Sequence, residues 1–173
     1  MIAAILKAAV LLFLAVLVQV SLADAYTILG GNFDLPLVIL SAVALLRGSI
    51  FGAMAGFCTG LLLDTANLGV LGFTSLLLTL AGFAVGRYGE TTGGDRFNAA
   101  LLSIAVITVL VGFGSLVLRF VLGEAVPAAT VLSGLPASVL LNLALTWPCF
   151  RLVRALIPRS ELSDRVHEVR LLA

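Results

Sequence analysis

Six apolar runs, separated by short polar or glycine-containing segments, fill most of this 173-residue chain, at residues 2–23, 35–46, 49–63, 69–85, 97–122 and 135–156. A helix that crosses the hydrocarbon core of a bilayer needs about 20 apolar residues, so these runs indicate membrane-spanning helices. Composition agrees, because 11% of the residues are charged, against roughly 25% in a soluble domain. The sequence therefore predicts an all-α, polytopic integral membrane protein with six transmembrane helices.

Two neighbouring runs, 35–46 and 49–63, are short for a full crossing. We expect a tilted or partly re-entrant pair of helices here. Asp34 and Pro36 favour a helix start at the first of them, because an acidic N-cap and a proline in the first turn are both typical of one.

The polar segments between the runs are expected to be loops, with Gly89, Gly93 and Gly94 as helix breakers in one of them; these segments are 24–34, 64–68, 87–98 and 123–133. After the last run, apolar side chains recur at helical spacing in residues 158–173. We expect two parts, a transmembrane bundle over 1–157 and a cytoplasmic amphipathic tail over 158–173.

Basic residues set the orientation in the membrane. With the N-terminus inside, Arg119 alone lies at the outer side, and the other nine basic residues lie at the cytoplasmic side: Lys7, Arg47, Arg87, Arg96, Arg151, Arg154, Arg159, Arg165 and Arg170. Cytoplasmic loops of membrane proteins carry this excess of Lys and Arg. The bias predicts that both termini are cytoplasmic.

The first run also has the features of a secretory signal peptide. Lys7 precedes an apolar stretch, and Ala23 and Ala25 flank Asp24 in the pattern of a cleavage site. Cleavage there would leave five spans.

Four glycines, Gly48, Gly52, Gly56 and Gly60, recur every fourth residue and so share one helix face. Small residues at this spacing let two helix backbones approach closely in lipid. The face either packs within the bundle or receives a partner's transmembrane helix, and the two interpretations are compatible.

Three charged residues near the ends of runs are candidate functional groups. Asp64 either caps the following turn at 65–69 or meets a cation. Arg119 either anchors its helix at the interface by extending its side chain toward water or pairs with a carboxylate such as Glu124 or Asp64. Arg47 lies in the turn between the two short runs, where it is a topology signal or a functional group.

Several classes of function are disfavoured. The chain has one histidine, no nucleophile beside a base, and no carboxylate pair well inside a run, so we expect no enzyme. Cys58 and Cys149 lie in apolar runs and indicate neither a metal site nor a disulfide, and no other cofactor is expected. A net charge of +1 gives no reason to expect nucleic acid.

Residues 34–88 resemble the MreD family, the rod shape-determining membrane proteins of bacteria. The similarity lies in the order and spacing of six short stretches: DLP at 34–36, LLRGS at 45–49, GAMAGF at 52–57, GLLLD at 60–64, LG at 68–69 and GFAVGR at 82–87. Residues 97–173 agree with the family only in hydropathy. Arg47, Gly52, Gly56, Gly60 and Asp64 match the family's recurring pattern, which does not assign them individual roles.

The resemblance implies a non-catalytic protein of the bacterial cytoplasmic membrane. Such a protein would act with the periplasmic scaffold MreC and the actin-like MreB. These organise the elongation machinery, which includes the glycosyltransferase RodA and a class B penicillin-binding protein. Peptidoglycan synthesis would thereby be held along the wall of a rod-shaped cell.

A second interpretation remains open, the substrate-binding membrane subunit of an energy-coupling-factor vitamin transporter. Those subunits also have six spans, a similar size and small-residue helix faces, such as Ala4 and Ala8 here offer. A pocket at the outer side would draw on few polar or aromatic groups, namely Tyr26, Phe33, Asp34 and Asp64.

Overall fold

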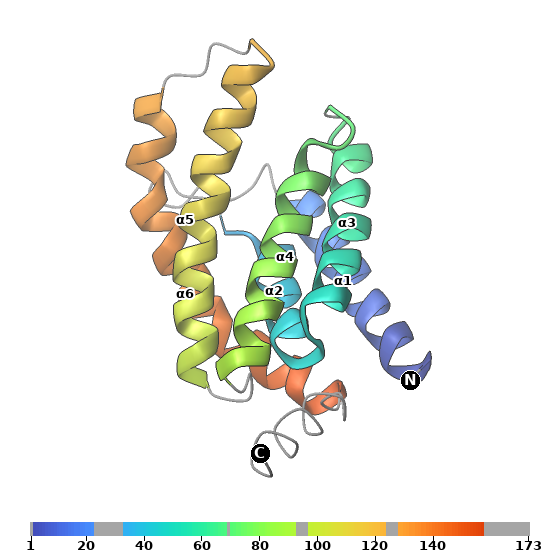
Figure 1. Cartoon of the computed structure of the whole chain (residues 1–173). Coiled ribbons are helices and arrows are strands. Elements are labelled where there is room, and N and C mark those ends of the chain that lie inside the picture. The colour runs from blue at the N-terminus through green and yellow to red at the C-terminus, as the bar shows by residue number, and fades with distance from the viewer. Residues whose placement is uncertain (1, 23–32, 69, 93–96, 124–127, 158–173) are drawn as a thin grey trace.

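The computed structural model describes residues 2–22, 33–68, 70–92, 97–123 and 128–157, and these form a bundle of six helices (Figure 1). The helices are α1 (Ile2–Leu22), α2 (Leu35–Arg47), α3 (Ser49–Ala66), α4 (Phe73–Thr92), α5 (Phe97–Val121) and α6 (Ala128–Leu156). The prediction of an all-α membrane protein with six helices is confirmed. By length and composition α3, α5 and α6 can each cross a membrane, while α1 and α2 hold the shorter apolar stretches Ile5–Ser21 and Leu35–Arg47.

The short helix α2 forms the centre of the bundle. Every residue from Pro36 to Leu46 is buried, and α2 contacts all five other helices. Its 13 residues give a length of about 20 Å, against a hydrocarbon core about 30 Å thick. Enclosure by protein explains how so short a helix is tolerated at membrane depth.

Local sequence sets both ends of α2. The Asp34 carboxylate accepts a hydrogen bond from the Leu37 backbone N–H (3.1 Å), and Pro36 stands in the first turn. At the other end, Gly48 has φ +94°, a left-handed conformation that glycine adopts without steric cost. This single residue reverses the chain into α3.

The ends of the helices separate two groups of charges. The α2–α3 turn, the end of α4 and the end of α6 lie at one end of the bundle, and the α3–α4 and α5–α6 connections lie at the other (Figure 1). Arg47, Arg87, Arg151 and Arg154 therefore lie at one end and Arg119 near the other, in agreement with the predicted orientation.

Four predicted boundaries are wrong. α3 continues past Asp64 to Ala66, and α6 begins at Ala128 within the expected loop 123–133. α4 begins at Phe73, four residues after the predicted start at 69, and continues past Gly89 to Thr92. Polarity does not end a helix where its backbone still packs, and Gly89 lies directly against the backbone of Leu45. The predicted tail at 158–173 lies outside the described residues, as do Asp24, Tyr26 and Glu124.

Candidate functional site

The glycine face of α3 lies against α4. A Cβ atom built on Gly52, Gly56 or Gly60 would fall on the backbone of Gly82, Leu78 or Ser75, respectively. The contact is reciprocal, since a Cβ on Gly82 would meet the carbonyl of Gly52. Because α4 covers this face, a partner helix would have to displace α4 to reach it.

Asp64 connects the outer ends of the same two helices. Its side chain is 3% exposed, and its carboxylate accepts hydrogen bonds from the backbone N–H groups of Gly72 (2.9 Å), Thr74 (2.9 Å) and Ser75 (3.2 Å). The first N–H groups of a helix have no partner within the helix. Asp64 therefore caps the start of α4, and not the turn at 65–69 that the sequence suggested.

Glu90 performs the converse role at the opposite end of α3 and α4. Its Oε1 accepts hydrogen bonds from the backbone N–H (2.7 Å) and the hydroxyl (2.8 Å) of Ser49, the first residue of α3. The same carboxylate pairs with Arg87 (3.3 Å). A Cβ at Gly48 would meet Glu90 Oε1 at 2.7 Å, so Gly48 leaves room for this contact. The pKa of Glu90 is lowered, chiefly by the Ser49 backbone N–H and further by the Ser49 hydroxyl and Arg87.

A cavity, here called the outer cleft because the predicted orientation places it at the outer side of the membrane, lies above the start of α2. Its volume is about 540 Å³, and all six helices contribute to its lining. At its floor, Asn142 accepts from the Asp34 backbone N–H (2.8 Å) and donates to the Thr108 hydroxyl (3.2 Å). Gln19 accepts from the Leu35 N–H (3.1 Å) and donates to the Phe33 carbonyl (2.8 Å). These amides satisfy the backbone where α2 starts inside the protein.

Arg119 lies at the rim of the outer cleft. Its guanidinium carbon lies 5.5 Å from the centre of the Phe73 ring. Arg119 and Phe73 also line a hollow of about 600 Å³ at the mouth, together with Asp64 and Asn67. The structure thus brings Arg119 and Asp64 to the same hollow. Arg47 lies at the opposite end, where its guanidinium carbon is 5.4 Å from the centre of the Phe51 ring.

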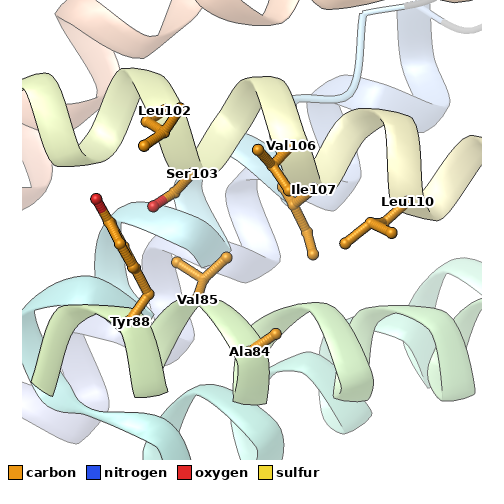
Figure 2. Close-up of a pocket in the computed structure, with 8 residues that line it drawn as sticks. All are labelled: Ala84, Val85, Tyr88, Leu102, Ser103, Val106, Ile107 and Leu110. Atoms are coloured by element: carbon orange, nitrogen blue, oxygen red, sulfur yellow. The ribbon is translucent and has the colours of Figure 1, made fainter. Parts of the chain in front are cut away.

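A separate groove of about 170 Å³ lies between α4 and α5, and we call it the α4–α5 groove. Figure 2 shows Ala84, Val85 and Tyr88 on α4 facing a row of α5 side chains. Its lining is almost entirely apolar, and the hydroxyls of Tyr88 and Ser103 lie toward one end (Figure 2). This surface is suited to an apolar occupant.

Sequence reasoning missed the amides and Glu90. Gln19 and Asn142 are polar residues inside the apolar runs 2–23 and 135–156, and polar side chains within a span are costly unless they have partners. That signal identifies them as candidates but not as partners of α2. Among the described residues, no group of three or more His, Cys, Asp or Glu side chains is placed to hold a metal ion.

Comparison with protein-family models matches residues 1–157 to the model described as rod shape-determining protein MreD. No curated protein and no solved structure gives a significant match.

Proposed function

The chain belongs to the MreD family of rod shape-determining proteins, and from this premise we propose that it is a non-catalytic membrane component of the bacterial elongation machinery. In this role it binds an MreC-like scaffold in the cytoplasmic (inner) membrane and helps to position peptidoglycan synthases. MreB, RodA and a class B penicillin-binding protein belong to the wider complex. The family match over 1–157 is the observation that carries the proposal.

The α4–α5 groove is the proposed docking site for the single membrane span of the scaffold. The glycine face of α3 is covered by α4, whereas Val106 and Leu110 beside the groove are half exposed. Ala84 in the groove leaves space for close approach of another helix, which is how helices associate in lipid. The apolar lining suits an occupant at hydrocarbon depth.

Co-purification tests the proposal. The tagged chain, extracted from its own membranes in mild detergent, is expected to retain a single-span periplasmic scaffold and cell-wall synthases, identified by mass spectrometry. Ala84→Phe fills the α4–α5 groove and should reduce scaffold recovery at least tenfold. Ala144→Phe makes the same change at an exposed position of α6 and should leave recovery unchanged.

Cell shape gives the second measurement. Depletion of the protein should make rod-shaped cells round, and Ala144→Phe should restore rods where Ala84→Phe does not. Rods that persist after depletion would contradict the shape-determining role. Equal scaffold recovery with both variants would contradict only the docking site.

The vitamin-transporter subunit remains the alternative, because the outer cleft has the size of a small-molecule pocket. That function requires paired ATPases and a large transmembrane coupling subunit. Their recovery in the same co-purification, in place of the scaffold, would favour transport.

A further inference from the structure

We propose that the connection between α3 and α4 lies within the outer leaflet, at the boundary between lipid headgroups and hydrocarbon, where Leu68 and Leu71 anchor it in lipid. This surface is separate from the α4–α5 groove, so its contact with lipid does not depend on the proposed function. Four features of the α3–α4 hairpin support the proposal: its exposed side chains, its charges, its length and its backbone hydrogen bonds.

The connection presents two large apolar side chains to its surroundings. Leu68 is 93% exposed and Leu71 is 66% exposed. Leu68 also has φ +51°, a left-handed conformation that leucine adopts only at a cost. Val70 borders the hollow at the mouth of the outer cleft, whereas Leu71 lines neither the hollow nor the cleft. Leu71 therefore faces the surroundings of the bundle, and exposed apolar groups of this kind indicate an apolar partner.

Charges occupy only one end of the hairpin. Between Arg47 and Arg87 the sequence contains a single charged residue, Asp64, and its carboxylate accepts backbone N–H groups at the start of α4. The opposite end of α4 carries the Arg87–Glu90 ion pair. An unpaired charge is costly in hydrocarbon but not in water. The absence of further charge therefore favours lipid around the connection.

The hairpin is too short to lift its connection clear of the membrane. α3 has 18 residues and is about 27 Å long, and α4 rises about 21 Å between Phe73 and Arg87. The hydrocarbon core is about 30 Å thick. With Arg47 and Arg87 at the inner boundary, the connection reaches at most the outer boundary of the core, and any tilt lowers it further.

The backbone of the connection is satisfied from within the protein, as a lipid environment requires. Asp64 accepts from the N–H groups of Gly72, Thr74 and Ser75. Backbone carbonyls of the hairpin accept four more, those of Asn67, Leu68, Phe73 and Leu76. These hydrogen bonds allow a non-helical segment to lie at the edge of the hydrocarbon. The Asp64 cap thus serves the position of the connection as well as the start of α4.

Spin labels test the depth of the connection. Single cysteines are placed in the full-length chain without Cys58 and Cys149, labelled with a nitroxide and reconstituted in liposomes of phosphatidylethanolamine and phosphatidylglycerol. Power saturation then compares collisions with oxygen, which concentrates in hydrocarbon, and with a water-soluble nickel chelate. Two positions on α4 give the references: Leu80→Cys is exposed in the middle of the helix, and Thr91→Cys is exposed at its inner end.

Leu68→Cys and Leu71→Cys should each give an oxygen-to-chelate ratio at least about threefold above that of Thr91→Cys, because a polar chelate is excluded from apolar surroundings. A ratio equal to that of Thr91→Cys would place the connection in water and overturn the proposal. Low collision rates with both reagents would indicate contact with protein, such as a second copy of the chain, and would also overturn it.

Leu68→Asn separates anchoring from folding. Asparagine adopts the left-handed conformation more readily than leucine, so the variant should fold, as measured by thermal unfolding. Loss of the apolar side chain should lower the oxygen-to-chelate ratio at position 71. Thr65→Asn introduces the same residue at a nearby exposed position and should leave the ratio unchanged. An unchanged ratio in folded Leu68→Asn would show that Leu68 is not an anchor.

Discussion

At the scale of single residues, two carboxylates join α3 and α4 by a reciprocal arrangement. Asp64 at the end of α3 caps the start of α4, and Glu90 near the end of α4 caps the start of α3. An anion is favourable at a helix N-terminus, where the N–H groups and the helix dipole are positive. Each carboxylate therefore stabilises the neighbouring helix more than its own.

Asp64→Asn should destabilise the folded protein by about 1–3 kcal/mol, because it removes a charged acceptor for three backbone N–H groups, that of the buried Ser75 among them, and adds a donor beside them. The measurement is the thermal unfolding midpoint in detergent. Thr65→Ala changes the neighbouring exposed residue and should have little effect. An unchanged midpoint for Asp64→Asn would show that the cap contributes no stability.

Glu90 should make stability depend on pH. Its pKa in the folded protein lies below the ordinary value of 4.5, first because the Ser49 backbone N–H donates to it. A carboxyl group whose pKa is lowered in the folded protein stabilises the folded state at pH values above its ordinary pKa. This stability is lost as pH falls through the lowered pKa. The wild type should therefore exceed Glu90→Gln in unfolding midpoint at pH 7, and the difference should vanish in acid. A pH-independent difference would refute this role of the charge.

At the scale of helices, the existence of six helices could be predicted, because each apolar run is long enough to indicate one. The C-terminal end of α4 and the N-terminal end of α6 could not be predicted. Hydropathy reports on contact with lipid, whereas Gly89 continues α4 through a backbone contact with Leu45. The sequence identified the glycine face and Asp64 as candidates, but only three-dimensional packing assigns α4 as their neighbour.

Gly56→Ala should be destabilising, because its new Cβ would overlap the backbone of Leu78 and the two helices must move apart. Overpacking of this kind costs about 1–3 kcal/mol. Gly56→Leu should prevent stable accumulation in the membrane. Cys58→Leu adds bulk on the exposed side of the same helix and should accumulate normally, as measured by membrane immunoblot and thermal unfolding. Equal behaviour of Gly56→Leu and Cys58→Leu would contradict close packing of α3 on α4.

At the scale of the whole molecule, the short length of α2 produces an asymmetric bundle. If the Arg47 end of α2 lies at the inner surface, its start lies about 10 Å below the outer one. The outer cleft occupies the space above it. The short run predicted an incomplete crossing. The cleft itself could not be predicted, because it depends on Gln19 of the preceding helix and on Asn142, 108 residues from Asp34, both lying beside the start of α2.

The orientation of the whole bundle can be tested with single cysteines in a chain that lacks Cys58 and Cys149. Val70→Cys, exposed in the α3–α4 connection, should react with a membrane-impermeant maleimide in cells whose outer envelope has been permeabilised. Arg87→Cys, exposed near the other end of α4, should react only after the cytoplasmic membrane is opened. The two positions belong to or adjoin one helix, so they must lie on opposite sides if α4 crosses the membrane. Labelling in the reverse order would invert the predicted topology and place the outer cleft at the cytoplasmic side of the membrane.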